Sequence, residues 1–227
     1  MTDPEERYVP LEEASKHIDL DLFPRDDATT AVEADRSYSF PVTTGAEYRG
    51  WYRITAGPDK GKALWVPKWS RYLGPRPSGK HGGSDLFGVD GTDLVALAAG
   101  TIEWRKAKPD WGNHIYLYHQ IEGVRHIAVY AHLDASGAFK DPKAVKKGEV
   151  IGKVGCTGNA GNGGACWRDA TCHGATAIED HLHLELLELD GAGQLQGKKD
   201  PVATYGWTVK YADDDSQKVC GKKEQLL

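Results

Sequence analysis

Residues 181–188 read His-Leu-His-Leu-Glu-Leu-Leu-Glu, a run in which apolar and polar side chains mostly alternate. A period of two is typical of a β-strand, where successive side chains point to opposite faces. His181 and His183 therefore share one face, and Leu182 lies on the other. Two adjacent imidazoles are hard to explain as core packing, so the pair indicates either a metal-binding face or an exposed strand face.

Other short runs rich in β-branched and aromatic residues precede this one, and Gly, Asp, Asn and Pro separate them. The chain has 27 glycines, 7 tryptophans and 10 tyrosines in 227 residues, which favours a turn-rich β protein over a helix bundle. Short strands separated by such turns predict a mainly β fold. The expected strands are Trp51–Thr55, Ala63–Val66, Leu94–Ala98, Thr101–Lys106, His114–His119, Val124–His132, Val150–Val154 and His181–Glu188.

The charge distribution argues against a nucleic-acid partner. The net charge is −5, and residues 1–36 hold 11 acidic against 4 basic side chains, so no basic stripe is visible. No apolar run approaches the ~18 residues of a membrane span. The start, MTDPEERYVP, lacks the basic and apolar regions of a signal peptide. We therefore expect either export by a non-classical route or a trimmed leader.

Two further histidine groups complete the parts of a metal site. His81 and Asp85 are four residues apart in a Gly-rich turn, and His132 closes the apolar run Val129–Leu133. Catalytic zinc sites use three protein ligands, His nitrogen and carboxylate oxygen, and leave one position for water. One Asp with two neutral His would leave the ion a net charge of about +1, which activates that water. Three other histidines, His17, His114 and His126, are expected at the surface or at sheet edges.

The order of these groups resembles the lysostaphin-type zinc endopeptidases, also called LytM-like or duplicated-hybrid-motif peptidases. That family has a His-x-x-x-Asp, then a Tyr-x-His-Leu, then a His-x-His. The segments DLFGVDGTDLVALAAGTI (85–102), WGNHIYLYH (111–119) and VKKGEVIGKVGCTG (145–158), with Phe40-Pro-Val and Asp200-Pro, are similar too. Val89 and Asp93 stand where the family commonly has proline.

The resemblance implies a compact antiparallel β-sheet with a groove over one Zn²⁺. It assigns His81, Asp85 and His183 as the zinc ligands and His132 and His181 as the catalytic pair. We favour His181 as general base, with His132 stabilising the oxyanion, and the reverse order stays open. The expected activity is hydrolysis of peptide cross-links in bacterial peptidoglycan by a metal-activated water.

The match covers residues 39–206 and divides the chain into three parts. Residues 1–38 form an acidic leader, partly disordered, with a short helix near Leu11–Ile18, and residues 207–227 form a polar tail. An insertion at 159–180 separates Gly158 from the His-x-His, where the family usually has a few residues.

Two other functions remain open: a non-catalytic, zinc-containing cell-wall binding or regulatory module, and a zinc peptidase that acts on proteins. The cell-wall reading predicts a secreted, antibacterial protein that acts in the periplasm or the extracellular cell wall. Its expected partner is a peptidoglycan peptide. A secretion-system or phage component and a cognate inhibitor are further partner classes, and the bond that is cut stays open.

The four cysteines are Cys156, Cys166, Cys172 and Cys220. We predict a disulfide between Cys166 and Cys172, because five residues separate them and glycines before Cys166 ease the turn. The alternatives are two free thiols, or a second metal site built from both cysteines and His173. With the disulfide, the insertion would form a lobe beside the groove that limits which peptide enters.

Overall fold

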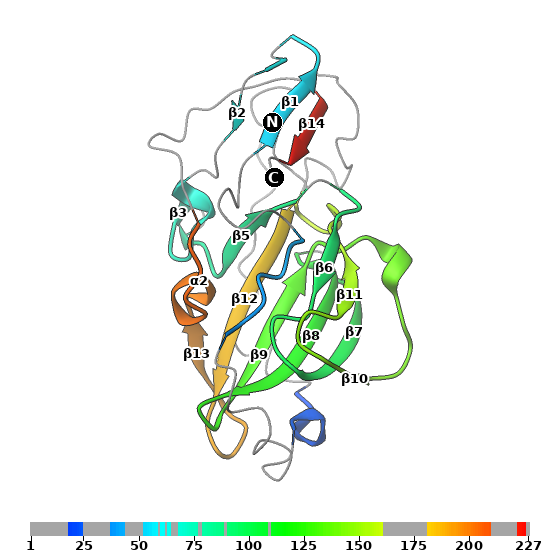
Figure 1. Cartoon of the computed structure of the whole chain (residues 1–227). Helices are drawn as coiled ribbons and strands as arrows, with labels where there is room; N and C mark the ends of the chain where they lie inside the picture. The colour runs from blue at the N-terminus through cyan, green and yellow to red at the C-terminus, as the bar shows by residue number, and fades with distance from the viewer. Residues whose placement is uncertain are drawn as a thin grey trace.

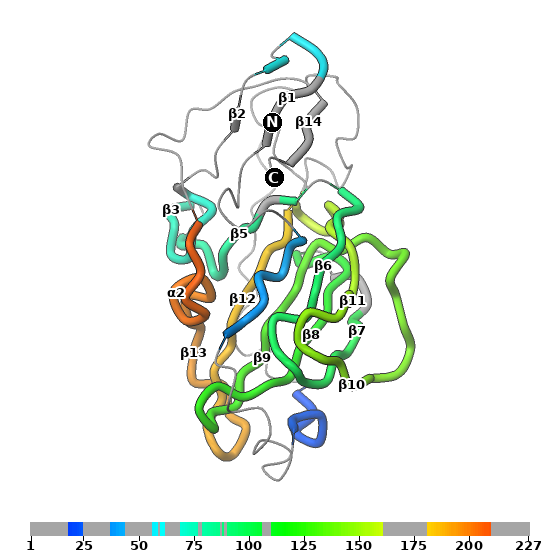
Figure 2. Tube along the Cα trace, in the orientation of Figure 1, coloured from blue at the N-terminus to red at the C-terminus, as the bar shows by residue number. Residues whose placement is uncertain are grey.

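The computed structural model describes residues 18–24, 37–43, 52–58, 60–61, 63–64, 68–76, 79–88, 90–108, 110–160, 181–209 and 222–225. Most of the expected helix at Leu11–Ile18, as well as His17, residues 161–180 and Cys220, falls outside this part of the chain. Figure 2 draws the described residues in colour. No helix within the described residues has the length and apolar character that crossing a bilayer requires.

Antiparallel strands dominate the architecture, which confirms the predicted mainly β fold class. The described elements are η1 Leu20–Leu22, β1 Tyr52–Ala56, β2 Ala63–Leu64, η3 Lys68–Ser70, β3 Pro75–Arg76, β4 Gly79–Lys80, β5 Ser84–Phe87, β6 Asp93–Val95, β7 Gly100–Lys108, β8 Gly112–Ile121, β9 Val124–Ala131, η4 Ala135–Gly137, β10 Lys143–Val145, β11 Val150–Lys153, β12 His181–Leu189, β13 Leu195–Lys199, α2 Pro201–Thr204 and β14 Lys222–Gln225.

The largest sheet has seven strands, in the order β10-β7-β8-β9-β12-β13, with β5 also paired to β12 (Figure 1). Strand β12 pairs with β9 along one edge. Its other edge pairs first with β5 and then with β13. Two-stranded sheets join β6 to β11 and β3 to β4, and a third small sheet has the order β14-β1-β2. Strand β14, at Lys222–Gln225, lies within the stretch 207–227 that was expected to form a polar tail.

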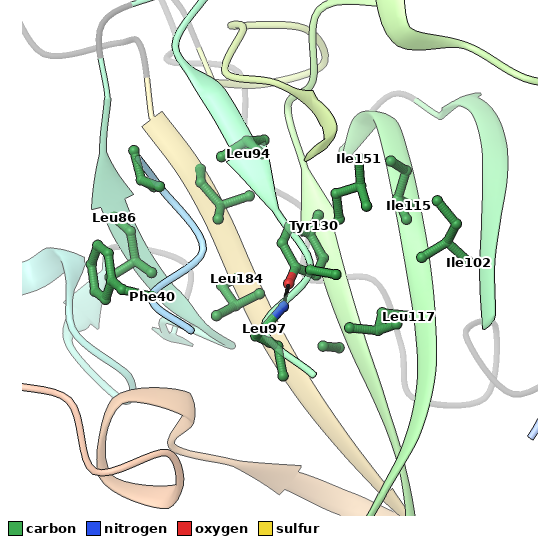
Figure 3. Close-up of a cluster of buried hydrophobic side chains, with 14 of the residues drawn as sticks. Phe40, Leu86, Leu94, Leu97, Ile102, Ile115, Leu117, Tyr130, Ile151 and Leu184 are labelled. Atoms are coloured by element: carbon green, nitrogen blue, oxygen red, sulfur yellow. Dashed lines mark hydrogen bonds between the residues drawn. The ribbon is translucent and has the colours of Figure 1, made fainter. Parts of the chain in front are cut away.

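One face of the large sheet covers the main core. Alternate residues of β8, β9 and β12 point into it, together with side chains from β5, β6, β7 and β11, as the labelled residues in Figure 3 show. Tyr130 lies in this core with no exposed surface. Its hydroxyl accepts a hydrogen bond from the Leu97 N–H at 2.9 Å and donates to the Val95 carbonyl at 3.2 Å. Tyr130 is therefore a residue of the main core.

The opposite face is also covered, by a second apolar cluster around Tyr116, Tyr118 and Trp111. Phe23, from the expected acidic leader, packs edge-on against Tyr118 with ring centroids 5.2 Å apart. Because both faces are covered, side chains of either parity are buried along the central strands.

The expected exposure of two histidines is wrong for that reason: His114 and His126 are both buried. Each ring accommodates burial through a hydrogen bond between Nδ1 and a nearby backbone carbonyl, that of Gly112 for His114 and that of Val124 for His126, at 2.9 Å in both cases.

Candidate metal centre

Strand register brings the first three candidate residues together. In the antiparallel pair β12·β5, His183 lies directly opposite Asp85, so both side chains point to the same face. His81 precedes β5 and is held by backbone hydrogen bonds with Leu73 and Gly74. All three side chains are buried, and Asp85 is only 2% exposed.

Three donor atoms converge between these residues. The Nδ1 atom of His183 lies 2.9 Å from the Asp85 Oδ1 and 3.0 Å from the His81 Nε2, and the last two atoms are 3.2 Å apart. Ligands at about 2.1 Å from one tetrahedral zinc ion would be about 3.4 Å apart. Two nitrogens and one carboxylate oxygen at this spacing fit a zinc ion after small side-chain movements.

Each ligand has a second contact that fixes its orientation. The His81 Nδ1–H faces the Arg71 carbonyl at 3.2 Å, which leaves the Nε2 lone pair free for a metal. The Arg76 guanidinium binds the outer Asp85 oxygen, Oδ2, at 2.9 Å and lies over the Trp69 ring, 4.7 Å from its centroid. Oδ1 is thereby left facing the histidines.

In the metal-free molecule, the charged groups at the site stabilise one another's ionised forms. Burial opposes ionisation of the Asp85 carboxyl, but His81 and His181 hold its pKa well below the usual value. Burial also disfavours charge on His183, but its hydrogen bonds to Asp85 and Glu185 raise its pKa to about 9. A metal that takes the His183 Nδ1 therefore displaces a proton, which is typical of metal binding by histidine.

The two remaining histidines lie against the ligands. The His132 ring is 4.9 Å from that of His181 and 5.6 Å from that of His183, centroid to centroid. The His181 Nε2 lies 3.4 Å from the Asp85 Oδ1. The structure thus gathers all five residues singled out in the sequence into one buried cluster.

His132 has an unusual backbone, with φ at +65° directly after β9. This left-handed conformation is uncommon for a residue other than glycine and turns the side chain out of the strand's alternation. The His132 N–H donates to the Trp111 carbonyl at 2.9 Å, and the ring Nδ1–H donates to the Thr157 carbonyl at 2.8 Å. Burial lowers the pKa of His132 well below its usual value.

Thr157 is fixed in turn by its own side chain. Its hydroxyl accepts from the Asn113 N–H and donates to the Leu133 carbonyl, both at 2.9 Å. Gly112 allows this close approach: its φ is +60°, and a Cβ there would lie 2.4 Å from the Thr157 carbonyl carbon. Thr157, Arg76 and Trp69 were not predicted from the sequence to be parts of the site.

Of the four cysteines, only Cys156 lies within the described residues. Cys156, next to Thr157, is fully buried and disulfide-bonded. Its partner lies outside the described residues, as do Cys166, Cys172 and His173. The predicted Cys166–Cys172 disulfide and the role of the insertion stay predictions.

Comparisons with known proteins match the part of the chain that carries this cluster. The model of peptidase family M23 matches residues 79–195. The catalytic domain of the antimicrobial peptidase lysostaphin from Staphylococcus simulans is 25% identical, with 62% of this chain and 87% of that one covered and a TM-score of 0.42. A zinc-containing peptidase from Vibrio cholerae is 26% identical, with 68% and 37% covered and a TM-score of 0.40.

A third solved structure, Csd3 from Helicobacter pylori, is 19% identical, with 84% of this chain and 35% of that one covered and a TM-score of 0.42. The chain thus spans little more than a third of the Vibrio and Helicobacter proteins. The comparison with curated proteins gives no match.

Proposed function

Because the chain belongs to peptidase family M23, whose model matches more than half of it, we propose that it hydrolyses the peptide cross-links of bacterial peptidoglycan. Membership makes the chain a metallopeptidase of a zinc-dependent family. The observation that carries the proposal is the convergence of ligand atoms from His81, Asp85 and His183 within 4.8 Å of one another. The motif resemblance to cell-wall endopeptidases supports the choice of substrate, and the proposed location is therefore the periplasm or the extracellular cell wall.

His81, Asp85 and His183 would hold the zinc ion through Nε2, Oδ1 and Nδ1. Zinc, when bound, supplies a Lewis acid that polarises a carbonyl and lowers the pKa of water at the site. Arg76 keeps the Asp85 carboxylate turned so that one oxygen faces the two histidines. Burial of all three ligands excludes bulk water, which strengthens their electrostatic interactions.

His132 is suited to accept a proton. Its Nδ1–H is committed to the Thr157 carbonyl, so in the neutral ring the lone pair is on Nε2. The position of this lone pair carries the assignment, because a pKa well below the usual value keeps the ring neutral near pH 7 but also makes it a weaker base. We therefore assign His132 as general base and His181 as the group that stabilises the oxyanion, the reverse of the order that the sequence favoured.

Purified peptidoglycan tests this function directly. The zinc-loaded chain is expected to release new amino groups, and mass spectrometry of the fragments would name the bond that is cut. Chelated protein and the His181→Ala variant are the inactive controls. Cleavage of casein with peptidoglycan left intact would favour a peptidase acting on proteins. If neither substrate is cut, the chain is a non-catalytic module.

A further inference from the structure

The far side of the His183 ring faces a buried carboxylate. The His183 Nε2 lies 3.1 Å from the Oε1 of Glu185, which is two residues further along β12 and on the same face. Glu185 is 3% exposed. The ring is therefore held between two carboxylates, with Asp85 at Nδ1 and Glu185 at Nε2.

Glu185 is itself paired with a cation on the neighbouring strand. The Nζ of Lys198, on β13, lies 2.6 Å from the Glu185 Oε2, and both side chains are less than a tenth exposed. Leu187 is the direct partner of Lys198 in the β12·β13 register, so Glu185 is its diagonal neighbour on one face. Lys198 thereby gives the buried Glu185 carboxylate the partner that a buried polar group needs and leaves Oε1 directed at His183.

We propose that Glu185 and Lys198 are positioning residues that fix His183 as a metal ligand through Nδ1. Only one ring nitrogen of a neutral histidine carries hydrogen, and a ligating nitrogen must not. The Glu185 carboxylate accepts the Nε2–H, which selects the tautomer with its lone pair on Nδ1 and holds the ring toward Asp85 and His81. This inference rests on the proposed function, in which His183 binds zinc.

The location of the ion pair argues against a purely structural role. A buried ion pair contributes little net stability, because the desolvation of both charges offsets their attraction. Here the pair is joined to one of the three candidate ligands and makes a continuous chain from Lys198 through Glu185 to His183. Carboxylates that contact metal-binding histidines in this way typically contribute 10–100-fold to metal affinity.

The same two strands provide a control pair nearer the surface. Glu188 on β12 has an oxygen 3.2 Å from the Lys199 Nζ and 3.6 Å from the His126 Nε2. This trio repeats the combination of carboxylate, lysine and histidine away from the metal ligands. The pair is more exposed than Glu185 and Lys198, with side chains 27% and 48% exposed for Glu188 and Lys199. Changes at Glu188 and Lys199 therefore control for the loss of a charged pair between β12 and β13 that does not contact a metal ligand.

The test measures zinc affinity by competition with a chromogenic chelator, using the full chain. We expect Glu185→Ala to weaken zinc binding about 10–100-fold and Lys198→Met to weaken it in the same direction. Glu185→Gln should weaken it less than Glu185→Ala, because the amide oxygen can still accept the Nε2–H. Glu188→Ala and Lys199→Met should bind zinc as wild type does.

Nitrogen-15 NMR of the histidine rings gives a readout independent of affinity. In the zinc-loaded wild type, the His183 Nε2 should carry hydrogen and Nδ1 should be the metal-bound nitrogen. Glu185→Gln should keep this pattern. Loss of zinc affinity in Lys198→Met with unchanged circular dichroism would support the inference even if Glu185→Ala fails to fold.

Zinc affinities of Glu185→Ala and Lys198→Met within twofold of wild type would overturn the inference, as would equal losses in the Glu188 and Lys199 controls. In both cases a wild type that binds zinc and cuts peptidoglycan leaves the proposed function standing. A wild-type chain that binds no zinc would overturn the proposed function and this inference together.

Discussion

Replacing Thr157 by valine should lower the stability of the fold slightly and the catalytic rate much more, because Thr157 orients His132. The change keeps the shape of the side chain but removes the hydroxyl that accepts from the Asn113 N–H and donates to the Leu133 carbonyl, both at 2.9 Å. A net hydrogen bond contributes about 0.5–1.5 kcal/mol, so the two together contribute about 1–3 kcal/mol to the free energy of unfolding. For a chain of this size, each kcal/mol lowers the Tm by about 2–4 °C.

The larger effect should be on turnover. The Thr157 carbonyl orients His132 through a 2.8 Å hydrogen bond, and without its anchors the carbonyl can shift. A misplacement of about 1 Å can lower a rate by up to about 10²-fold, so we expect kcat to fall at least about tenfold with zinc content unchanged. Peptidoglycan hydrolysis, metal analysis and thermal unfolding measure the three quantities. Thr157→Ser, which keeps the hydroxyl, is the control. Wild-type kcat and Tm in Thr157→Val would refute the reasoning.

Four further outcomes are expected. Asp85→Ala should lose bound zinc and activity together; an Asp85→Ala protein that retains one zinc per chain would show the ligand set to be wrong. His132→Ala should keep zinc and the fold but lose about 10²-fold or more in rate, and near-wild-type turnover would contradict its role. Tyr130→Phe leaves the Leu97 N–H without its hydroxyl partner and should cost about 1–3 kcal/mol in urea unfolding, with activity per folded molecule unchanged. Burial and the nearby His126 lower the pKa of His119 from 6.5 to about 3, so the unfolded chain binds more protons between these values. As the pH is lowered below about 6.5, the free energy of unfolding should therefore decrease by up to about 1.4 kcal/mol per pH unit. The decrease should be less steep in His119→Gln.

The strands of the central sheet were predictable because their patterns are long and apolar. The expected run Val124–His132 became β9 at Val124–Ala131, and Thr101–Lys106 lies inside β7. The missed strands are all short, and β13 and β14 are rich in polar residues; they are β3, β4, β5, β10, β13 and β14. Such segments become strands only through pairing with a neighbour, which depends on tertiary structure.

The candidate ligands could be predicted because their motifs resemble those of a known family, but the residues that orient these ligands could not. His183 and Asp85 stand in a motif, whereas Lys198 reaches Glu185 only because β13 lies beside β12. The Arg76 contact with Asp85 likewise depends on how the chain turns before β5. These contacts involve segments whose local sequence contains no motif that indicates a metal site.

The pairing of β12 with β5 has a consequence for how the molecule folds. Asp85 and His183 are 98 residues apart in the chain, so the unfolded state holds them together only at a large cost in chain entropy. Contacts of such high sequence separation form slowly. Zinc therefore meets a complete ligand set only after the middle of the sheet has assembled. Metal uptake during refolding should then lag behind the burial of Tyr130 and its neighbours. The ion, bound late in folding, should slow the unfolding of the chain.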